Sequence, residues 1–324
     1  MASIEKRGKR WRAKVRREGY PPISKTFGTK AEAQTWARQQ ESRMDTDSWQ
    51  DTREAASTTL EEALGRYERE VIKRKKSPAK ERSRVELWRR SRLARASLLR
   101  IRGVDVAEWR DERLEHVSGG TVRRDMALLS DLYRVARSEW GLEGLHNPCA
   151  DIWCPPPGRP RVRRLEAHEE RALRQTARTE VQEAYLDLAL ETGMRRGELL
   201  AMVWSRVDLQ NRVVYVPDSK NGSSREVPLS KRAIAALRSF PRHLDGNVWP
   251  WNGEGADSMW VRWKHRAGIV GLTFHDLRHE ATSRLVESGR FSLTQVAAIT
   301  GHKDLRMLQV YANHRASDLA RAMD

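Results

Sequence analysis

Residues 275–311 read HDLRHEATSRLVESGRFSLTQVAAITGHKDLRMLQVY, and this stretch decides how the rest of the chain is interpreted. Two histidines and an arginine recur in it at helical spacing, a third histidine follows a glycine, and a tyrosine lies in a predicted helix. These side chains are His275, Arg278, His279, His302 and Tyr311. Arginine and histidine donate the hydrogen bonds that stabilise the charge of a phosphodiester in its transition state. The stretch has no carboxylate cluster to hold a metal, so the phenol is the expected nucleophile and a covalent intermediate is expected.

The composition of the whole chain favours a polyanionic partner. Its 324 residues carry 61 Lys and Arg against 44 Asp and Glu, a net charge of +17. From Lys73 to Arg102 there are thirteen basic residues and two acidic ones, Glu81 and Glu86. Like charges so close together would repel one another without a counter-surface, and a phosphate backbone supplies one. We therefore expect double-stranded DNA to be the partner.

Targeting signals and cysteines indicate a reducing compartment. The sequence has no apolar run that could span a bilayer, and its N-terminus, MASIEKRGKRW, lacks the hydrophobic core of a secretory signal. Cys149 and Cys154 fit neither a metal-binding pair nor a disulfide framework. We expect both cysteines to be reduced, and the protein to be cytoplasmic, associated with the nucleoid and without a membrane partner.

Residues 1–50 are predicted to form a small DNA-binding module. Within residues 10–17 apolar and basic residues alternate, the pattern of a half-buried strand. Residues 23–27 can return as a second strand, and Thr29 begins a capping box for a helix. The outer face of the first strand is expected to contact DNA through Arg10, Arg12, Lys14 and Arg16.

Residues 58–150 are predicted to form a small helical domain that binds DNA. Helical periodicity is found at residues 60–71, 80–99, 106–115 and 121–140. DNA contacts are expected from the basic run of Lys73, Arg74, Lys75 and Lys76. The proline-rich segment 155–160 would connect this domain to a third one, residues 160–324, which is mostly helical with a small sheet built from residues 213–216 and 223–229.

Three further segments complete a pattern with residues 275–311. Residues 192–199 read TGMRRGEL, residues 219–222 read SKNG, and residues 225–229 read REVPL. In this order, over residues 165–315, the pieces resemble the tyrosine site-specific recombinases, or phage-type integrases. One box alone would be weak evidence, but a chance match of all of them is improbable. The resemblance implies a multidomain, mainly α fold: the sheet-plus-helix module, the helical domain, and a mixed α+β catalytic domain of the tyrosine recombinase type.

The resemblance also implies which residues bind the phosphate. Arg195 and Arg278 would grip the non-bridging oxygens of the scissile phosphate, and His302 would donate a further hydrogen bond to them. The two guanidinium charges would favour the phenolate form of Tyr311 over its ordinary pKa of about 10. Thr300 stands where the family often has leucine, a difference that we expect to affect packing and not chemistry.

Proton transfer is assigned by the same resemblance. His275 would exchange a proton beside the phosphate and the tyrosine, and Lys220 would protonate the departing 5′-oxygen. Two supporting residues, Glu198 and His279, would orient the site. The implied enzyme is a prophage or genomic-island integrase that integrates and excises DNA through a 3′-phosphotyrosyl bond, without metal, ATP or other cofactor. The implied partners are core and arm-type attachment sites, a tetramer of the protein on DNA, and directionality and DNA-bending accessory proteins.

Four alternatives stay open at this level. His275 and His279 have the H-x-x-x-H spacing of zinc ligands, with His302 as a third, although a zincin would have a glutamate after the first histidine. Tyr311 alone could be a core tyrosine. A type IB topoisomerase uses the same chemistry without site preference. A DNA-binding regulator could keep the scaffold and lack catalysis.

Overall fold

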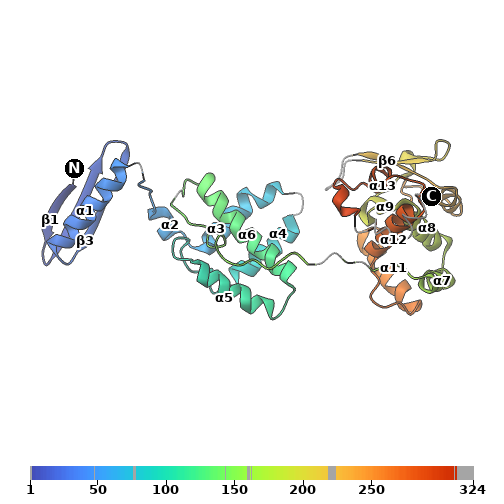
Figure 1. The fold of residues 1–324 in the computed structure, drawn as a ribbon, viewed down its shortest axis with the longest axis horizontal. Coiled ribbons are helices and arrows are strands. Elements are labelled where there is room, and N and C mark those ends of the chain that lie inside the picture. Colours follow the sequence, from blue (N-terminus) through green and yellow to red (C-terminus); the bar gives the residue numbers. More distant parts are fainter. Residues whose placement is uncertain are drawn as a thin grey trace, which may run out of the picture. The chain divides into compact units, whose positions relative to one another are not determined.

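The structure, a computed structural model, describes residues 2–46, 48–75, 78–142, 144–158, 161, 163–217, 224–309 and 311. It forms two compact units, Met1–Arg159 and Pro160–Asp324, each with hydrophobic cores of its own (Figure 1). Among the described residues, no helix has the length and apolar character needed to cross a membrane. Helices predominate, and each unit contains a three-stranded sheet. The predicted fold class is confirmed, while the exact domain limits stay a prediction.

The first unit begins with a sheet packed on one helix. Strands β1 (Ala2–Arg7), β2 (Arg10–Arg17) and β3 (Tyr20–Phe27) are antiparallel in that order, and α1 (Lys30–Asp45) packs against them. The core between them consists of Ala13, Val15, Ile23, Ala33, Ala37 and Met44. The sequence does not predict β1, because only two of its side chains, Ala2 and Ile4, are apolar.

The basic side chains of β2 lie on the face of the sheet away from this core. Ala13 and Val15 are fully buried, and alternate residues of a strand point to opposite faces. Arg12 and Lys14 therefore point outward, in phase with Arg10. Their neighbours in register on β1 and β3 are Ser3, Glu5, Ser24 and Thr26. The module thus presents its basic groups among serine and threonine side chains and one glutamate, and its contact with DNA stays a prediction.

The rest of the first unit is a group of helices around an aromatic core. They are α2 (Arg53–Ser57), α3 (Leu60–Glu70), the 3-10 helix η1 (Ile72–Arg74), α4 (Pro78–Arg89), α5 (Gly103–Leu114) and α6 (Gly119–Ser138). In the core, the rings of Trp88 and Trp109 stack with their centroids 3.9 Å apart. The helix predicted over residues 80–99 ends at Arg89, because the turns that follow bury Leu93 instead of continuing the helix.

The expectation that the basic run Lys73–Arg102 needs an external counter-surface is wrong, because the unit supplies acidic partners of its own. Many of its side chains pair with acidic groups of the same unit: Lys75, Arg82, Arg84, Arg89, Arg90, Arg92 and Arg102. Lys75 itself lies 2.9 Å from the Tyr67 hydroxyl and 3.3 Å from an Asp131 carboxylate oxygen. Lys73 and Arg74 are exposed, and Lys76 lies outside the described residues. DNA contact through these residues stays a prediction.

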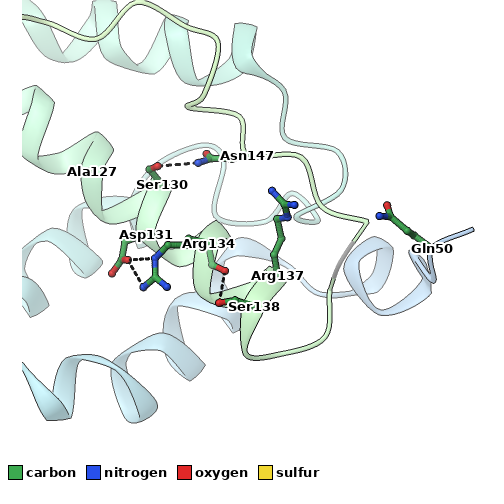
Figure 2. Close-up of a pocket in the computed structure, with 8 residues that line it drawn as sticks. All are labelled: Gln50, Ala127, Ser130, Asp131, Arg134, Arg137, Ser138 and Asn147. Carbon is green, nitrogen blue, oxygen red and sulfur yellow. Dashed lines mark hydrogen bonds and ion pairs between the residues drawn. The ribbon is translucent and has the colours of Figure 1, made fainter. Parts of the chain in front are cut away.

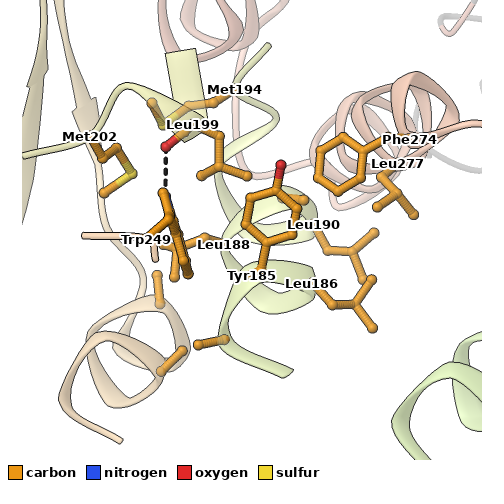
Figure 3. Close-up of a cluster of buried hydrophobic side chains, with 14 of the residues drawn as sticks. Tyr185, Leu186, Leu188, Leu190, Met194, Leu199, Met202, Trp249, Phe274 and Leu277 are labelled. Carbon is orange, nitrogen blue, oxygen red and sulfur yellow. Dashed lines mark hydrogen bonds between the residues drawn. The ribbon is translucent and has the colours of Figure 1, made fainter. Parts of the chain in front are cut away.

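The second unit surrounds a central helix, α8. Its elements are α7 (Ala167–Thr176), α8 (Glu180–Thr192), α9 (Arg196–Leu200), η2 (Trp204–Arg206), β4 (Val207–Asp208), β5 (Val213–Val216), β6 (Arg225–Pro228), α10 (Lys231–Arg238), α11 (Gly253–Arg266), α12 (Phe274–Glu287), α13 (Leu293–Thr300) and η3 (Leu305–Met307). Strands β4, β5 and β6 form an antiparallel sheet in that order. Tyr185 of α8 stacks on Phe274 of α12 and meets Trp249 edge-on, with ring centroids 4.8 and 4.9 Å apart (Figure 3). This packing fixes α12 against α8.

Arginines near the start of the second unit bind to α12. Arg161 Nε donates to Asp276 Oδ1 at 2.9 Å, and Arg164 Nε donates to Glu280 Oε2 at 2.9 Å. Arg164 also pairs with Glu287. The Asp276 and Glu280 carboxylates are almost completely buried, so these ion pairs tie the segment before α7 to the helix that carries His275, Arg278 and His279.

Candidate active site

Arg195 is fixed at the start of a helix. Helix α8 ends at Gly193, whose φ of 58° is a left-handed conformation that glycine adopts without strain, and Arg195 then caps α9. Its backbone N–H donates to Glu198 Oε2 at 3.0 Å and its Nη1 to Oε1 at 2.7 Å. Its Nη2 donates to the Gly301 carbonyl oxygen at 2.8 Å. The guanidinium is therefore held between the start of α9 and the end of α13.

Arg278, on α12, reaches the same place. Its Nη1 donates to the carbonyl oxygens of Gly193, at 2.7 Å, and Thr300, at 2.6 Å. Arg195 and Arg278 thus donate to consecutive carbonyls, Gly301 and Thr300, and their guanidiniums converge. Burial, and next the charge of Arg195, lower the pKa of Arg278 to about 10. Like charges held this close favour an anion between them.

Glu198 joins Arg195 to a third guanidinium, that of Arg225 on β6. Arg225 Nη2 donates to Glu198 Oε2 at 2.7 Å and Nη1 donates to Oε1 at 3.2 Å, while Nε donates to the Ile299 carbonyl oxygen at 3.3 Å. Burial raises the pKa of Glu198, but the hydrogen bonds from Arg225 and Arg195 outweigh it and lower that pKa to about 2. Two guanidiniums therefore share one ionised carboxylate, and with Arg278 nearby the group keeps a net positive charge.

His302 follows Gly301, which ends α13 with a φ of 74°. Its Nε2 lies 3.2 Å from Arg278 Nη2, and its Nδ1 lies 2.6 Å from Thr300 Oγ1. Burial, followed by the charges of Arg278 and Arg195, lowers the pKa of His302 to about 3. The imidazole is therefore neutral near neutral pH.

Tyr311 lies beside this group, in a turn after η3 and not in the predicted helix. Its phenol hydrogen-bonds with His279 Nδ1, and the two ring centroids are 5.8 Å apart. His275, one turn earlier on α12, meets the His279 ring edge-on at 4.8 Å. The resemblance assigned proton exchange to His275, whereas His279 is the histidine that the structure places against the phenol.

The phenol is protonated in the free protein. Burial raises the pKa of Tyr311 by more than the charge of Arg278 lowers it, so the expectation that the arginines favour the phenolate is not met without DNA. The pKa of His279 is lowered, mainly by burial, so its ring is neutral and can accept a proton. Both groups are thus uncharged in the free protein.

Lys220 lies outside the described residues. The chain leaves the described part at Pro217, which lines a cavity of about 170 Å³ together with Glu198 and Met194. It re-enters at Ser224, next to Arg225, which contacts Glu198. Both described ends of the lysine segment therefore meet the site.

The sequence does not identify Arg225 as a functional candidate, and Thr300, which was expected to affect packing alone, contacts His302. Arg225 lies two residues before the buried Val227 on β6 and four before the buried Leu229. Because alternate residues of a strand face the same side, this spacing predicts that the Arg225 side chain lies on the inner face of the sheet. A charged side chain on an inner face needs a partner, so the position of this arginine in the strand pattern is the feature that could have identified it. Thr300 gave no such signal, because its contact with His302 depends on the turn at Gly301.

The three histidines are not arranged as a metal site. Within the described ranges, no three His, Cys, Asp or Glu side chains converge in that way. One ring nitrogen of His279 faces Tyr311, and those of His302 face Thr300 and Arg278. The zinc alternative therefore lacks a ligand set in this part of the chain.

A hollow of about 720 Å³ lies in the first unit, on α6 (Figure 2). It is lined by Gln50, Ala127, Ser130, Asp131, Arg134, Arg137, Ser138 and Asn147. Arg134 is held by Asp131 at 2.7 Å, and Asn147 donates to Ser130 at 2.9 Å. These pairs engage Arg134, Asp131, Ser130 and Asn147 with one another.

Known proteins resemble this chain in sequence and in fold. Residues 163–318 match the Phage integrase family. The chain is 39% identical over 276 residues to the shufflon-specific DNA recombinase of Escherichia coli, which covers 82% of this chain and 72% of that protein. It is 34% identical over 330 residues to a putative integrase/recombinase of Haemophilus influenzae, covering 95% and 86%. A lambda integrase dimer bound to a COC' core site has the same fold, with a TM-score of 0.68 and 22% identity over 98% of this chain and 95% of that one. The chain thus belongs to the phage integrase family of tyrosine site-specific recombinases, enzymes that cleave and rejoin DNA.

Proposed function

We propose that this enzyme integrates and excises a mobile DNA element, such as a prophage or genomic island, through a 3′-phosphotyrosyl intermediate on Tyr311. The observation that carries the proposal is the convergence of Arg195 and Arg278 on the carbonyls of residues 300 and 301, with His302 beside them and Tyr311 within reach. A cationic group of this kind stabilises the charge that builds on phosphoryl oxygens.

In the proposed reaction, Arg195 and Arg278 bind the non-bridging oxygens of the scissile phosphate. The Tyr311 oxygen attacks phosphorus as the bond to the 5′-oxygen breaks. The phenol proton passes to His279, which already meets the phenol, and His275 lies behind it. Lys220 supplies the proton that the departing 5′-oxygen needs. The phosphotyrosyl bond keeps the energy of the original diester, so a 5′-hydroxyl of a partner strand reverses the step without ATP or a metal.

The remaining parts of the chain would select and arrange the DNA. The helical region and the catalytic unit would bind the core site, and the basic face of β2 would bind arm-type sites. A tetramer, with directionality and DNA-bending accessory proteins, would exchange strands through a Holliday junction. A lambda integrase tetramer bound to a Holliday junction, with a TM-score of 0.65, supports this assembly by analogy of fold.

Inversion of a DNA segment is a second candidate. The similarity to a shufflon-specific recombinase, 39% identity over 82% of this chain, favours it. Plasmids that carry two copies of the site in inverted or in direct orientation, or on separate molecules, distinguish the two. An integrase joins separate molecules and excises between direct copies, whereas an invertase acts on the inverted pair.

A nicked suicide duplex tests the chemistry. The duplex carries the junction of the element's ends, with a nick that lets the cleaved 5′-hydroxyl fragment diffuse away. We expect covalent protein–DNA adducts on a denaturing gel, in chelator and without ATP, and no adduct with Tyr311→Phe. Equal trapping on any duplex would favour the topoisomerase, and binding without trapping would favour the regulator.

A further inference from the structure

The contacts of Thr300 determine where His302 carries its proton. Thr300 is fully buried, and its Oγ1 lies 2.6 Å from the Val296 carbonyl oxygen and 2.6 Å from His302 Nδ1. A carbonyl oxygen only accepts, so the one hydroxyl proton of Thr300 goes to Val296. Towards the imidazole the hydroxyl oxygen must then accept. His302 Nδ1 therefore carries a proton.

The other ring nitrogen is bare. Arg278 Nη2 lies 3.2 Å from His302 Nε2, and a guanidinium only donates, so Nε2 is the acceptor. The other titratable groups that act on this ring are Arg195 before α9, Arg225 on β6 and His279 on α12. These groups are cationic or neutral, so they oppose a second proton while no phosphate or sulfate is bound.

We propose that Thr300 is a positioning residue that couples binding of the scissile phosphate to uptake of one proton by His302. A phosphate oxygen only accepts, so His302 must present an N–H from Nε2 to it. Because Thr300 retains the proton on Nδ1, the proton on Nε2 comes from solvent, while Arg278 turns its N–H from Nε2 to the phosphate. The negative charge of the phosphate offsets the positive charge that the second proton adds to His302.

The coupling rests on the proposed function of the site. Within that function, Thr300 is the residue that makes phosphate binding require an added proton on His302. With an apolar residue at position 300, the neutral ring could move its single proton to Nε2 and donate to the phosphate without protonation. Thr300→Val has nearly the same shape and removes the acceptor. Thr300→Ser keeps the hydroxyl and is the matched control.

Nitrogen NMR of the full chain labelled with ¹⁵N-histidine tests the first half. The resonances of His302 are assigned by their loss in His302→Gln. Without an anion we expect a protonated Nδ1 and a bare Nε2 in the wild type, in Thr300→Ser and in Thr300→Val, because Arg278 donates to Nε2 in all three. A wild type with its proton on Nε2 overturns the proposal.

Sulfate, whose charge is constant across the neutral range, tests the second half as a phosphate substitute. Saturating sulfate should protonate both nitrogens of His302 in the wild type and in Thr300→Ser. It should leave Thr300→Val neutral with its one proton moved to Nε2, and a doubly protonated ring in Thr300→Val overturns the role of Thr300. An unchanged wild-type ring overturns the coupling, whether or not sulfate perturbs other signals. Neither readout needs cleavage at Tyr311, so a failure of the proposed function, seen as absent trapping on the suicide duplex, is distinguishable from a failure here.

Discussion

Glu198 holds the guanidiniums of Arg195 and Arg225 with one buried carboxylate. Its pKa of about 2 lies below the ordinary 4.5, so its stabilisation is present above the ordinary value and is lost as the pH falls towards 2. The shift corresponds to about 3 kcal/mol. We expect Glu198→Gln to lower the free energy of unfolding by about that amount at neutral pH, and by less in acid.

Urea denaturation at neutral and acidic pH measures this difference. The control is Glu226→Gln, at an exposed position on β6 next to Arg225, which should change the stability by less than about 0.5 kcal/mol. Equal stability of wild type and Glu198→Gln at neutral pH would show that the carboxylate does not hold the arginines.

His279 meets the phenol of Tyr311, so its loss should be felt in the chemical step. We expect His279→Ala to slow covalent trapping by roughly a hundredfold or more, as removal of a general base does. The remaining rate should rise with pH, because the phenol must then lose its proton to solvent. Rapid-quench trapping on the suicide duplex measures both effects.

His275→Ala is the comparison for this prediction. Its ring meets His279 and not the phenol, so the loss should be smaller. If His275→Ala abolished trapping and His279→Ala left it intact, the proton would belong to His275 and the contact in the free protein would be incidental.

Site residues could be predicted from sequence where the motif contains the chemistry. Arg195, Arg278, His302 and Tyr311 stand in segments with a recognisable order, and the described structure brings them together. The partner of Arg225 is 27 positions away, so only the fold reveals that pair.

At the scale of elements, α12 carries the reactive face, and the ion pairs with Arg161 and Arg164 lie on it as well. Asp276 is 1% exposed in its side chain and accepts from Arg161 and from the Thr273 backbone. Arg161→Ala should leave that carboxylate with fewer partners and lower the unfolding free energy by roughly 1–3 kcal/mol.

Chemical denaturation of the full chain checks this value. Arg171→Ala, at an exposed position on α7, is the matched control and should have little effect. An Arg161→Ala protein as stable as the control would show that Thr273 alone satisfies Asp276.

Helices and strands whose apolar residues recur with a clear period were predictable from the sequence, and those without such a period were not. The alternation in β2 is strong, but β1 has only Ala2 and Ile4 facing the core and was missed. The basic residues after Arg89 suit a helix by propensity, yet the chain turns there because tertiary burial of Leu93 outweighs that preference.

For the whole molecule, the excess charge predicts a strong dependence of DNA binding on salt. The logarithm of affinity falls with the logarithm of salt by about 0.9 for each phosphate contact. Replacing the four basic residues of β2 that are predicted to contact DNA by glutamine should therefore reduce the slope by up to about four. These residues are Arg10, Arg12, Lys14 and Arg16.

Fluorescence anisotropy with arm-site and random duplexes measures the slope. Arg38→Gln with Arg43→Gln, at exposed positions on α1, is the control and should change it less. An unchanged slope in the β2 variant would place the DNA contact elsewhere. Composition predicted the kind of partner, but it could not tell internally paired arginines such as Arg89 from those available to DNA, because pairing depends on tertiary contacts.

The turn at Gly301 has a consequence for genetic variation. A Cβ built there would lie 2.7 Å from Arg225 Cζ, and the φ of 74° already disfavours any other residue. Even a methyl group would displace the Arg225 guanidinium that binds Glu198, and it would disturb the backbone next to His302. Alleles that alter this glycine should therefore reduce activity as strongly as alleles of the reactive residues. Glycine has no functional group, so the requirement at this position is for the absence of a side chain.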